Sequence, residues 1–401
     1  MIIRELTSAD DAAYRLTIAS AWDWPTDRTS ATDGLGTPGS ESAKSRFGVF
    51  EGERMTSAFT VCEHITAFEG RWITTWDLEQ VATRPDHRRS GCIRAAFDAL
   101  FPLMRENGIS LAALMPFSFP FYRQFGYEEI YRVCTLTLPL DRLAPCRRYS
   151  GGAFLLEDDA GLRELDEFYT AFALQTNMAT RRDRTLWEKI AGLSPTAQPK
   201  FTYCFRNADG RVSGYLTYQP KKTPELRRME IGEFVYSDLA TLRAMLAFLS
   251  TFSSHYDTAR IIDLPLFLDF HPALDDFAGT AHETRAYKML RVVDAAKALE
   301  LKRYPAREGS FTVYVEDTLE WNRGGYTVSF GGKDARVVKN SLAPHECDLA
   351  VEARMLSRLL AGSVAITDPK LALFEGLELN SNRALLADIF TERPIYQTDF
   401  Y

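Results

Sequence analysis

The sequence predicts a mixed α+β and α/β fold in three parts. Two tandem domains, each with a central mixed sheet flanked by helices, are followed by a smaller α+β domain. Three observations lead to this prediction. An apolar strand passes through a basic corner into a helix at residues 78–105, a partly similar pattern returns after residue 152, and short alternating strands begin after Leu290. We therefore expect domains at residues 1–145, 146–288 and 289–401.

The first domain is expected to alternate strands and helices. Ala9–Ala21 follows Thr7 and Ser8, either of which can cap a helix. Arg46–Phe50 and Met55–Cys62 alternate like the strands of a hairpin. Residues 26–45 are rich in Gly, Ser, Thr, Asp and Pro and should form a long mobile loop, a type of segment that often serves as a lid. The other predicted strands are Ile2–Leu6, Arg71–Thr83, Leu111–Met115 and Val133–Leu138.

The corner between the strand at residues 78–83 and the helix at Cys92–Arg105 is expected to bind an anion. The amides of a first helical turn point outward, and the helix dipole favours negative charge there. Gly91 lets the backbone approach a phosphate closely, and Arg88 and Arg89 add charge-assisted hydrogen bonds. Helical spacing of apolar side chains supports the helix, at Ile93, Phe97, Leu100 and Met104.

An aromatic segment, Phe121-Tyr-Arg-Gln-Phe-Gly-Tyr127, comes between the last two predicted strands of this domain. We expect most of its rings to lie in the hydrophobic core. Tyr122 is the exception, because a phenol hydroxyl needs a polar partner when its ring is buried. It is therefore the candidate for a functional role.

The second domain partly repeats the first. A helix at Leu162–Thr170, a hairpin at Phe201–Tyr218 and a strand at Glu230–Tyr236 lead to a helix at Leu239–Thr251. The connection before this last helix has no Arg-x-x-Gly. We therefore expect that this domain has lost its phosphate loop and forms a wall of the acceptor site.

The third domain is expected to combine antiparallel strands with short helices. Gly324-Gly325 and Gly331-Gly332 are its predicted turns. The chain ends in an aromatic segment, Pro394–Tyr401, whereas a disordered tail would be polar, so we expect the terminus to pack inside the protein. The predicted elements are the helices Val293–Leu301, Ala353–Leu360 and Asn382–Ile389 and the strands Phe311–Glu316, Tyr326–Gly331 and Ala335–Lys339.

Composition narrows the class of partner. The chain of 401 residues has a net charge of −7 and a pI of about 5.6, which argues against a nucleic-acid surface and for cationic or neutral small molecules. We expect no membrane span, because no run of 18 apolar residues occurs, and no signal peptide is apparent. No histidine pair has metal-ligand spacing, so no metal is expected. The six scattered cysteines fit reduced thiols in a cytoplasmic protein: Cys62, Cys92, Cys134, Cys146, Cys204 and Cys347.

Several further side chains are candidates for the acceptor site, each with a structural alternative. Trp22, Asp23 and Trp24 follow the first helix and either line an acceptor pocket or cover the edge of the core. Asp77 and Glu79 lie on the central strand and either relay a proton or pair with nearby arginines.

The basic corner, Arg88-Arg89-Ser90-Gly91-Cys92-Ile93, resembles the pyrophosphate loop of GNAT acetyltransferases, with Ile93 in place of the last small residue. The aromatic segment Phe121–Tyr127, which precedes the last predicted strand of the first domain, resembles the corresponding segment at the end of a GNAT domain. Two such domains, a sterol-carrier-like third domain and an aromatic C-terminus resemble the Eis (enhanced intracellular survival) family over the whole chain. The resemblance implies an N-acetyltransferase that uses acetyl-coenzyme A on amines of aminoglycosides, polyamines or lysine side chains.

The same resemblance implies roles for individual residues. Tyr122 would be the general acid, and the α-carboxylate of Tyr401 would be the general base. Asp399, near that carboxylate in sequence, is a candidate for binding a cationic substrate together with Trp22, Asp23, Trp24 and Glu79. The family often forms hexamers, so we expect a homo-oligomer. The residues expected to hold acetyl-coenzyme A are Val81, Ala82, Thr83, Arg88, Arg89, Gly91, Cys92, Ile93 and Arg94.

These groups suit the chemistry. A carboxyl terminus has a reference pKa of roughly 3.5, so it is a poor base unless burial raises it. A phenol of pKa about 10 can protonate a thiolate of pKa roughly 8.5, an uphill step of ~2 kcal/mol. Two other functions remain open, namely a carrier of an apolar ligand in the third domain and a regulatory protein that senses coenzyme A.

Overall fold

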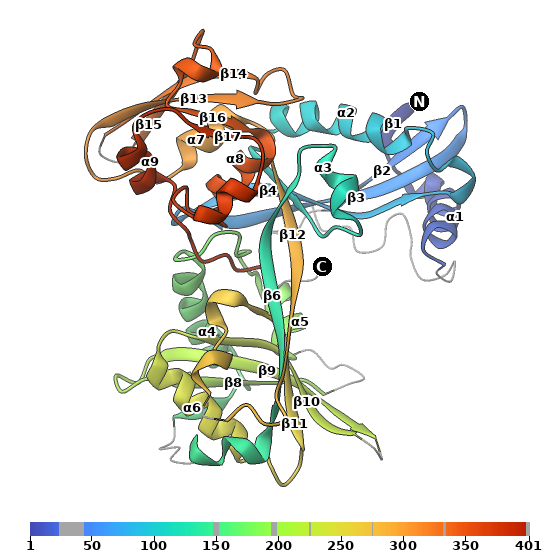
Figure 1. Cartoon of the computed structure of the whole chain (residues 1–401). Coiled ribbons are helices and arrows are strands. Elements are labelled where there is room, and N and C mark those ends of the chain that lie inside the picture. Colours follow the sequence, from blue (N-terminus) through green and yellow to red (C-terminus); the bar gives the residue numbers. More distant parts are fainter. Residues whose placement is uncertain are drawn as a thin grey trace. The chain divides into compact units, whose positions relative to one another are not determined.

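The computed structural model describes residues 1–23, 44–146, 152–193, 199–223, 226–274, 276–331 and 334–397. The chain divides into two compact units (Figure 1). The first unit combines residues 1–131 with residues 287–393, and the second contains residues 132–286 and the C-terminal segment from Pro394. The predicted domain boundaries stay a prediction.

The first unit contains a mixed sheet in the order β1-β2-β3-β4-β5-β12. The strands β1 to β4 are antiparallel, β4 and β5 are parallel, and β5 is antiparallel to β12. Their bounds are β1 Ile2–Glu5, β2 Lys44–Glu51, β3 Arg54–Phe68, β4 Arg71–Thr83, β5 Leu111–Leu114 and β12 Ala281–Val292.

Strand β4 changes course in its second half. Its register with β5 covers Trp76–Leu78 and goes no further in the described chain. Two residues later the register with β3 shifts, because Gln80 and Val81 stand opposite a single residue, Phe59. Gln80 is left-handed there, with a φ of +50°. This β-bulge turns the end of β4 away from β5, so its last residues pair with β3 on one side only and border the pocket.

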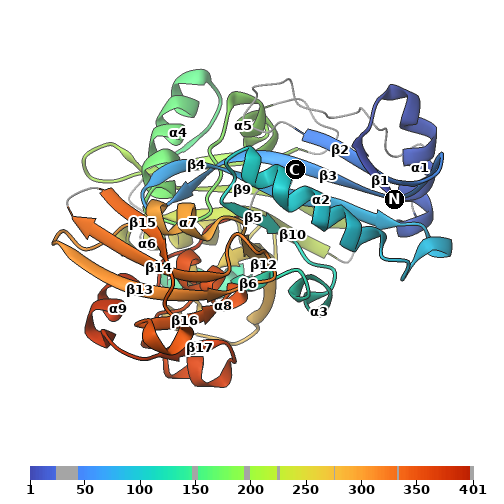
Figure 2. The same cartoon turned by 90° about the horizontal axis from the view of Figure 1, so that it is seen from above.

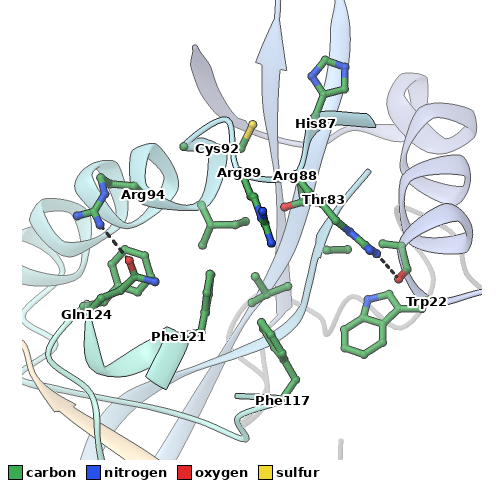
Figure 3. A pocket seen from close by; sticks show the side chains of 16 residues that line it. Trp22, Thr83, His87, Arg88, Arg89, Cys92, Arg94, Phe117, Phe121 and Gln124 are labelled. Carbon is green, nitrogen blue, oxygen red and sulfur yellow. Dashed lines mark hydrogen bonds between the residues drawn. The ribbon is translucent and has the colours of Figure 1, made fainter. Parts of the chain in front are cut away.

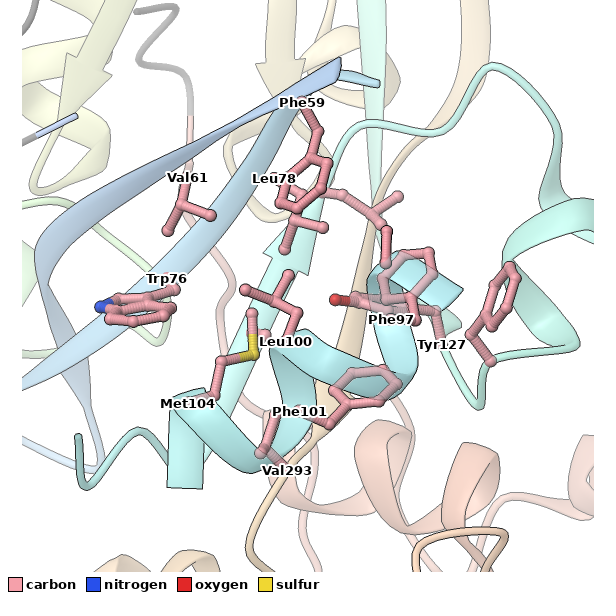
Figure 4. Packing of buried hydrophobic residues seen from close by; sticks show 14 of the residues in the cluster. Phe59, Val61, Trp76, Leu78, Phe97, Leu100, Phe101, Met104, Tyr127 and Val293 are labelled. Atoms are coloured by element: carbon pink, nitrogen blue, oxygen red, sulfur yellow. The ribbon is translucent and has the colours of Figure 1, made fainter. Parts of the chain in front are cut away.

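Two helices cover opposite faces of this sheet. Helix α1, Asp11–Trp22, packs Tyr14 and Ile18 on one face, and α2, Cys92–Glu106, packs on the other. The side chains of α2 at helical spacing interlock with Trp76 and Leu78 of β4 (Figure 4). Helix α2 is followed by Gly108, whose φ of +73° gives the chain a left-handed turn out of the helix.

The third part of the chain belongs to the first unit. Its five strands lie in the order β15-β14-β13-β16-β17, with β13 and β16 parallel and the other pairs antiparallel (Figure 2). Helix α8 packs on β13 and β16. The bounds are α7 Ala295–Leu301, β13 Gly309–Glu316, β14 Gly324–Gly331, β15 Asp334–Asn340, β16 Leu349–Glu352, α8 Ala353–Ala361, β17 Leu377–Leu379 and α9 Arg383–Ile389.

The second unit contains a similar mixed sheet, in the order β6-β11-β10-β9-β8-β7, with β10 and β11 parallel. A bulge at Gly232 shifts the register of β10 with β9, as the bulge at Gln80 shifts that of β4 with β3. The bounds are β6 Glu128–Pro139, β7 Ala153–Leu155, α4 Asp159–Ala173, α5 Arg184–Ala191, β8 Phe201–Arg206, β9 Val212–Thr223, β10 Leu226–Tyr236, α6 Leu239–Ser250 and β11 Thr258–Pro265.

The C-terminal segment packs within this second unit as far as it is described. Tyr396 is 1% exposed, and its ring lies edge-on against Tyr169 and Phe172 of α4. Its hydroxyl donates to Glu233 at 3.3 Å. Ile395 is buried as well, so the described part of this segment packs inside the protein, whereas the predicted packing of residues 398–401 lies outside the described residues.

Some elements differ from the predictions. Strand β6 starts at Glu128 and not at Val133, because apolar side chains continue the strand backwards, and Gly324-Gly325 begin β14 where a turn was expected. Neither β11 nor β12 was predicted. Most of the predicted loop, residues 26–43, lies outside the described residues. The five cysteines whose side chains are described are buried and form no disulfide: Cys62, Cys92, Cys134, Cys204 and Cys347. Within the described ranges, no helix is long and apolar enough to cross a membrane.

Candidate active site

A pocket of about 770 Å³ lies at the basic corner of the first unit (Figure 3). One wall is the end of β4, and another is the first turn of α2 with the loop before it. The aromatic segment around α3, Phe119–Arg123, lies opposite. The lining residues are Ala21, Trp22, Val81, Ala82, Thr83, His87, Arg88, Arg89, Gly91, Cys92, Ile93, Arg94, Phe117, Phe121, Gln124 and Phe125. All nine residues predicted to hold acetyl-coenzyme A are therefore brought together around one cavity.

The backbone of the corner leaves the amides of α2 open toward the pocket. Gly91 is the N-cap of α2, with a φ of +83°, and it has no side chain to occupy those amides. A Cβ added at Gly91 would meet no protein atom within 4 Å, so the positive φ, and not a lack of space, is what favours glycine here. Arg89 is also left-handed, with a φ of +65°, a strained conformation for a residue with a Cβ.

Three arginines bring positive charge to this corner, and no acid among the described residues pairs with them. The Arg88 guanidinium donates to the carbonyl of Ala21 at 3.3 Å, and Arg94 donates to Oε1 of Gln124 at 3.0 Å. In the described part of the chain, neither they nor Arg89 forms an ion pair with a carboxylate. Figure 3 shows Arg88 and Arg89 directed into the pocket, so the free charge faces the cavity. The pocket is therefore built to receive an anion.

Two small side chains hold the corner together. The Ser90 hydroxyl donates to the carbonyl of His87 at 2.6 Å and lies 3.1 Å from the Cys92 sulfur. Cys92 is 2% exposed, and its sulfur is also 3.3 Å from Oγ1 of Thr56 on β3. These contacts connect the loop before α2 to the sheet, and they give Ser90 a structural role.

Tyr122 lies in the aromatic cluster directly behind the pocket wall. Its ring is edge-on to Phe117 and Phe121, which line the pocket, at centroid distances of 5.4 Å and 5.1 Å. The side chain is 2% exposed, and burial raises the pKa of its phenol above the ordinary value. Its hydroxyl makes no hydrogen bond with a described residue, so the expected polar partner is absent among them. Tyr127 is fully buried beside it.

The residues predicted for the acceptor site are dispersed. Trp22 lines the pocket and is 39% exposed, so it is not part of the closed core. Asp23 ends α1 in a left-handed conformation and does not line the pocket, and neither does Glu79. Asp77 forms a buried ion pair at 2.5 Å with Lys288 of β12. The partner is a lysine, whereas the structural alternative for Asp77 named a nearby arginine. The remaining candidates, Trp24, Asp399 and Tyr401, lie outside the described residues.

Three residues of this region were not singled out from the sequence. Phe117 and Gln124 line the pocket, Phe117 four residues before the recognised aromatic segment and Gln124 within it, so its spacing was a usable signal. Gln80 supports the bulge of β4, because its Oε1 accepts hydrogen bonds from Tyr14 at 2.8 Å and Thr60 at 3.2 Å. Nothing in the local sequence indicates a bulge at Gln80.

Comparison with known domain families gives three consecutive matches. Residues 3–130 and residues 179–292 each match an acetyltransferase (GNAT) domain, and together these two matches cover more than half of the chain. Residues 295–397 match the sterol carrier protein domain.

Comparison with individual proteins agrees. An uncharacterized N-acetyltransferase of Streptomyces avermitilis is 22% identical over 301 residues, 71% of each chain. A protein of unknown function from Enterococcus faecalis, described as a probable N-acyltransferase, superposes with a TM-score of 0.82 at 18% identity, covering 100% of this chain and 99% of that one. Eis1 from Mycobacterium abscessus superposes with a TM-score of 0.78 at 19% identity over the whole of both chains. With two GNAT domains followed by a sterol-carrier-type domain, this chain belongs to the GNAT N-acetyltransferases, and its fold is similar to that of Eis1.

Proposed function

We propose that this enzyme transfers the acetyl group of acetyl-coenzyme A to a primary amine of a small molecule of the aminoglycoside, polyamine or lysine type. The observation that carries the proposal is the pocket at the first turn of α2, where Arg88, Arg89 and Arg94 have no carboxylate partner in the described chain. A pyrophosphate supplies the missing negative charge, and open helical amides are suited to bind it.

In this proposal the corner holds the pyrophosphate and β4 holds the arm that leads to the thioester. The residues in contact with the pyrophosphate are Arg88, Arg89, Gly91, Ile93 and Arg94. The backbone of Val81 and Thr83, which borders the pocket beyond the bulge, hydrogen-bonds the pantetheine arm. An amide at the end of β4 also stabilises negative charge that develops on the thioester oxygen.

Tyr122 is proposed to donate the proton that the departing thiolate requires. Burial raises its pKa, so the phenol is protonated at neutral pH and ready to donate. The same burial makes the transfer more uphill than the ~2 kcal/mol estimated from reference pKa values. The proton transfer is therefore effective only if Tyr122 is held within hydrogen-bonding distance of the sulfur.

The proposed base is the α-carboxylate of Tyr401. A carboxylate attracts a cationic amine and takes a proton from it, provided that burial raises its low reference pKa. Trp22, Asp23, Trp24, Glu79 and Asp399 are proposed to contact the acceptor, and Trp22 has the support of lining the pocket. We further propose a cytoplasmic homo-oligomer, for which light scattering of the purified protein is the direct measurement.

Release of free thiol from acetyl-coenzyme A, with a panel of aminoglycosides, polyamines and lysine peptides, tests the reaction. Calorimetric titration with coenzyme A tests the pocket separately. Arg89→Ala should weaken coenzyme A binding roughly 10- to 100-fold, the value of one charge-assisted hydrogen bond. Arg15→Ala is the matched control, because Arg15 is paired with Asp11 on α1. No binding of coenzyme A and no turnover with any amine would refute the proposal.

Three variants test the assigned proton transfers. Tyr122→Phe should lower kcat while coenzyme A binding is retained, because only the hydroxyl is removed. Deleting Tyr401, or extending the chain by one alanine beyond it, should also lower kcat by moving the carboxylate. Normal kcat in the extended protein would show that the terminal carboxylate is not the base.

A further inference from the structure

A second cluster of potential ligand atoms lies within the second unit. Cys134 of β6, Asp269 after β11 and His282 near the start of β12 come from three separate segments. One ligand atom of each, the Cys134 sulfur, an Asp269 carboxylate oxygen and a His282 ring nitrogen, lies within 4.8 Å of the other two. The His282 Nε2 and the Asp269 Oδ2 are 2.8 Å apart.

The surrounding structure holds these groups in place. The pairing of β6 with β11 shifts register between Ile261 and Leu264. Cys134 lies opposite Leu264, where the regular pairing resumes, and it is fully buried. The other oxygen of Asp269 accepts the backbone N–H of His271 at 2.9 Å, which fixes the direction of the carboxylate. The rings of His271 and His282 stack with centroids 4.8 Å apart. The cluster is thus closed on its inner side by the thiol and open to solvent through the exposed His282.

We propose that Cys134, Asp269 and His282 bind a zinc ion. A thiolate, a carboxylate oxygen and an imidazole nitrogen are the three ligand types that zinc takes in proteins. In a tetrahedral zinc site neighbouring ligand atoms are about 3.3–3.6 Å apart, given Zn–N, Zn–O and Zn–S bonds of about 2.0–2.3 Å. The present distances need changes of about 1.3 Å or less to reach this geometry. The fourth position goes to a water molecule or to His271.

A simple ion pair between Asp269 and His282 explains only two of the three residues. It gives no reason for a sulfur at the same point, whereas a thiol is the group that selects a soft metal over calcium or magnesium. On binding, the thiol of Cys134 releases its proton to solvent and forms a zinc–sulfur bond. The ion then joins β6, the segment after β11 and β12 in one cross-link. The sequence predicted no metal, because these residues are brought together by the fold and not by a short spacing.

Titration of metal-free, full-length protein with zinc and cobalt(II) ions tests the site. We expect one ion per chain and, for cobalt, the near-ultraviolet charge-transfer band of a thiolate ligand. Cys134→Ser should abolish that band. His282→Ala, at an exposed position, should weaken binding by about 100-fold or more, beyond the 10- to 100-fold typical of losing an outer-shell partner.

Matched controls separate this site from other thiols and histidines of the same unit. Cys204→Ser removes another buried thiol, and His255→Ala removes a histidine outside the cluster. Both should keep the wild-type affinity. Zinc should raise the Tm of the wild type and not that of His282→Ala, a comparison that needs no buried substitution. The proposal is overturned if the wild type binds no zinc, or if Cys134→Ser keeps the cobalt–thiolate band in a folded protein.

Discussion

Removing the side chain of Gln80 should disturb both the stability of the first unit and its affinity for acetyl-coenzyme A. Gln80 occupies the bulge of β4 in a left-handed conformation, directly before the pocket residues Val81 to Thr83. Its Oε1 accepts from the hydroxyls of Tyr14 and Thr60, which are 0% and 1% exposed. The side chain therefore ties the bulge to helix α1 on one side and to β3 on the other.

The magnitude follows from the two hydroxyls. A buried polar group that loses its partner costs about 1–3 kcal/mol, and the longer bond from Thr60 contributes the smaller share. We expect Gln80→Ala to lower the free energy of unfolding by about 2–3 kcal/mol. Gln80→Gly loses the same two bonds but removes the strain of a left-handed residue, about 1 kcal/mol, so it should be less destabilised. Gln80→Glu keeps an acceptor oxygen for both hydroxyls and should be the mildest of the three.

Urea denaturation measures the stability, and thiol-release kinetics measure the function. In Gln80→Ala the KM for acetyl-coenzyme A should rise about tenfold, equivalent to 1.4 kcal/mol, because the amides of Val81 and Thr83 are no longer held in register. The kcat should change less, since Tyr122 lies on another segment. Gln175→Ala, an exposed glutamine of the second unit, is the control. An unchanged KM in a destabilised Gln80→Ala would refute the link between the bulge and the cofactor pocket.

Three further outcomes are expected. Gly91→Asp should abolish measurable coenzyme A binding, because its carboxylate would place negative charge at the amides of α2. Gly91→Asn is the control, since its side chain has nearly the same shape without the charge. Calorimetry should show that Gly91→Asn binds coenzyme A more tightly than Gly91→Asp. The proposed general acid, Tyr122, acts as a protonated phenol, and burial raises its pKa; under this proposal the acid is available below the raised pKa and is lost only above it. The pH profile of kcat should therefore show no loss assignable to Tyr122 below about pH 10. A decrease of kcat at lower pH that is present in the wild type and absent from Tyr122→Phe would contradict this. Asp77→Asn should cost about 3–5 kcal/mol in thermal or urea unfolding by leaving Lys288 charged and buried, whereas Asp77→Leu combined with Lys288→Met should recover most of that loss.

The sequence was informative where a local pattern determines a local structure. The corner from Arg88 to Gly91 was predicted as an anion site because a helix start, a glycine and arginines are adjacent in the chain, and the pocket lies there. The hairpin at β2 and β3 and the helix α2 follow in the same way from alternation and helical spacing. These features need no knowledge of distant residues.

The features that were not predicted depend on contacts between distant segments. Strand β12 pairs with β5 although Leu114 and its partner Met289 are 175 residues apart in the sequence, so the pairing has no local signal. The bulge at Gln80 is stabilised by Tyr14, on a helix that is 66 residues away in sequence. The partner of Asp77 is 211 residues away, which is why it was expected among nearby arginines. Pairing over such distances is decided by the assembled sheet.

The two GNAT domains differ at the start of one helix in a way that bears on anion binding. In each, a bulged strand leads into a helix, followed by a parallel strand. At α2 the N-cap is Gly91, which leaves the amides open beside three arginines. At α6 the N-cap is Asp238, whose carboxylate accepts the N–H of Thr241 at 2.8 Å. That hydrogen bond lowers the pKa of Asp238, so its negative charge persists where a phosphate would bind. The second helix start therefore satisfies its own dipole and repels an anion, whereas the first depends on a ligand to do so.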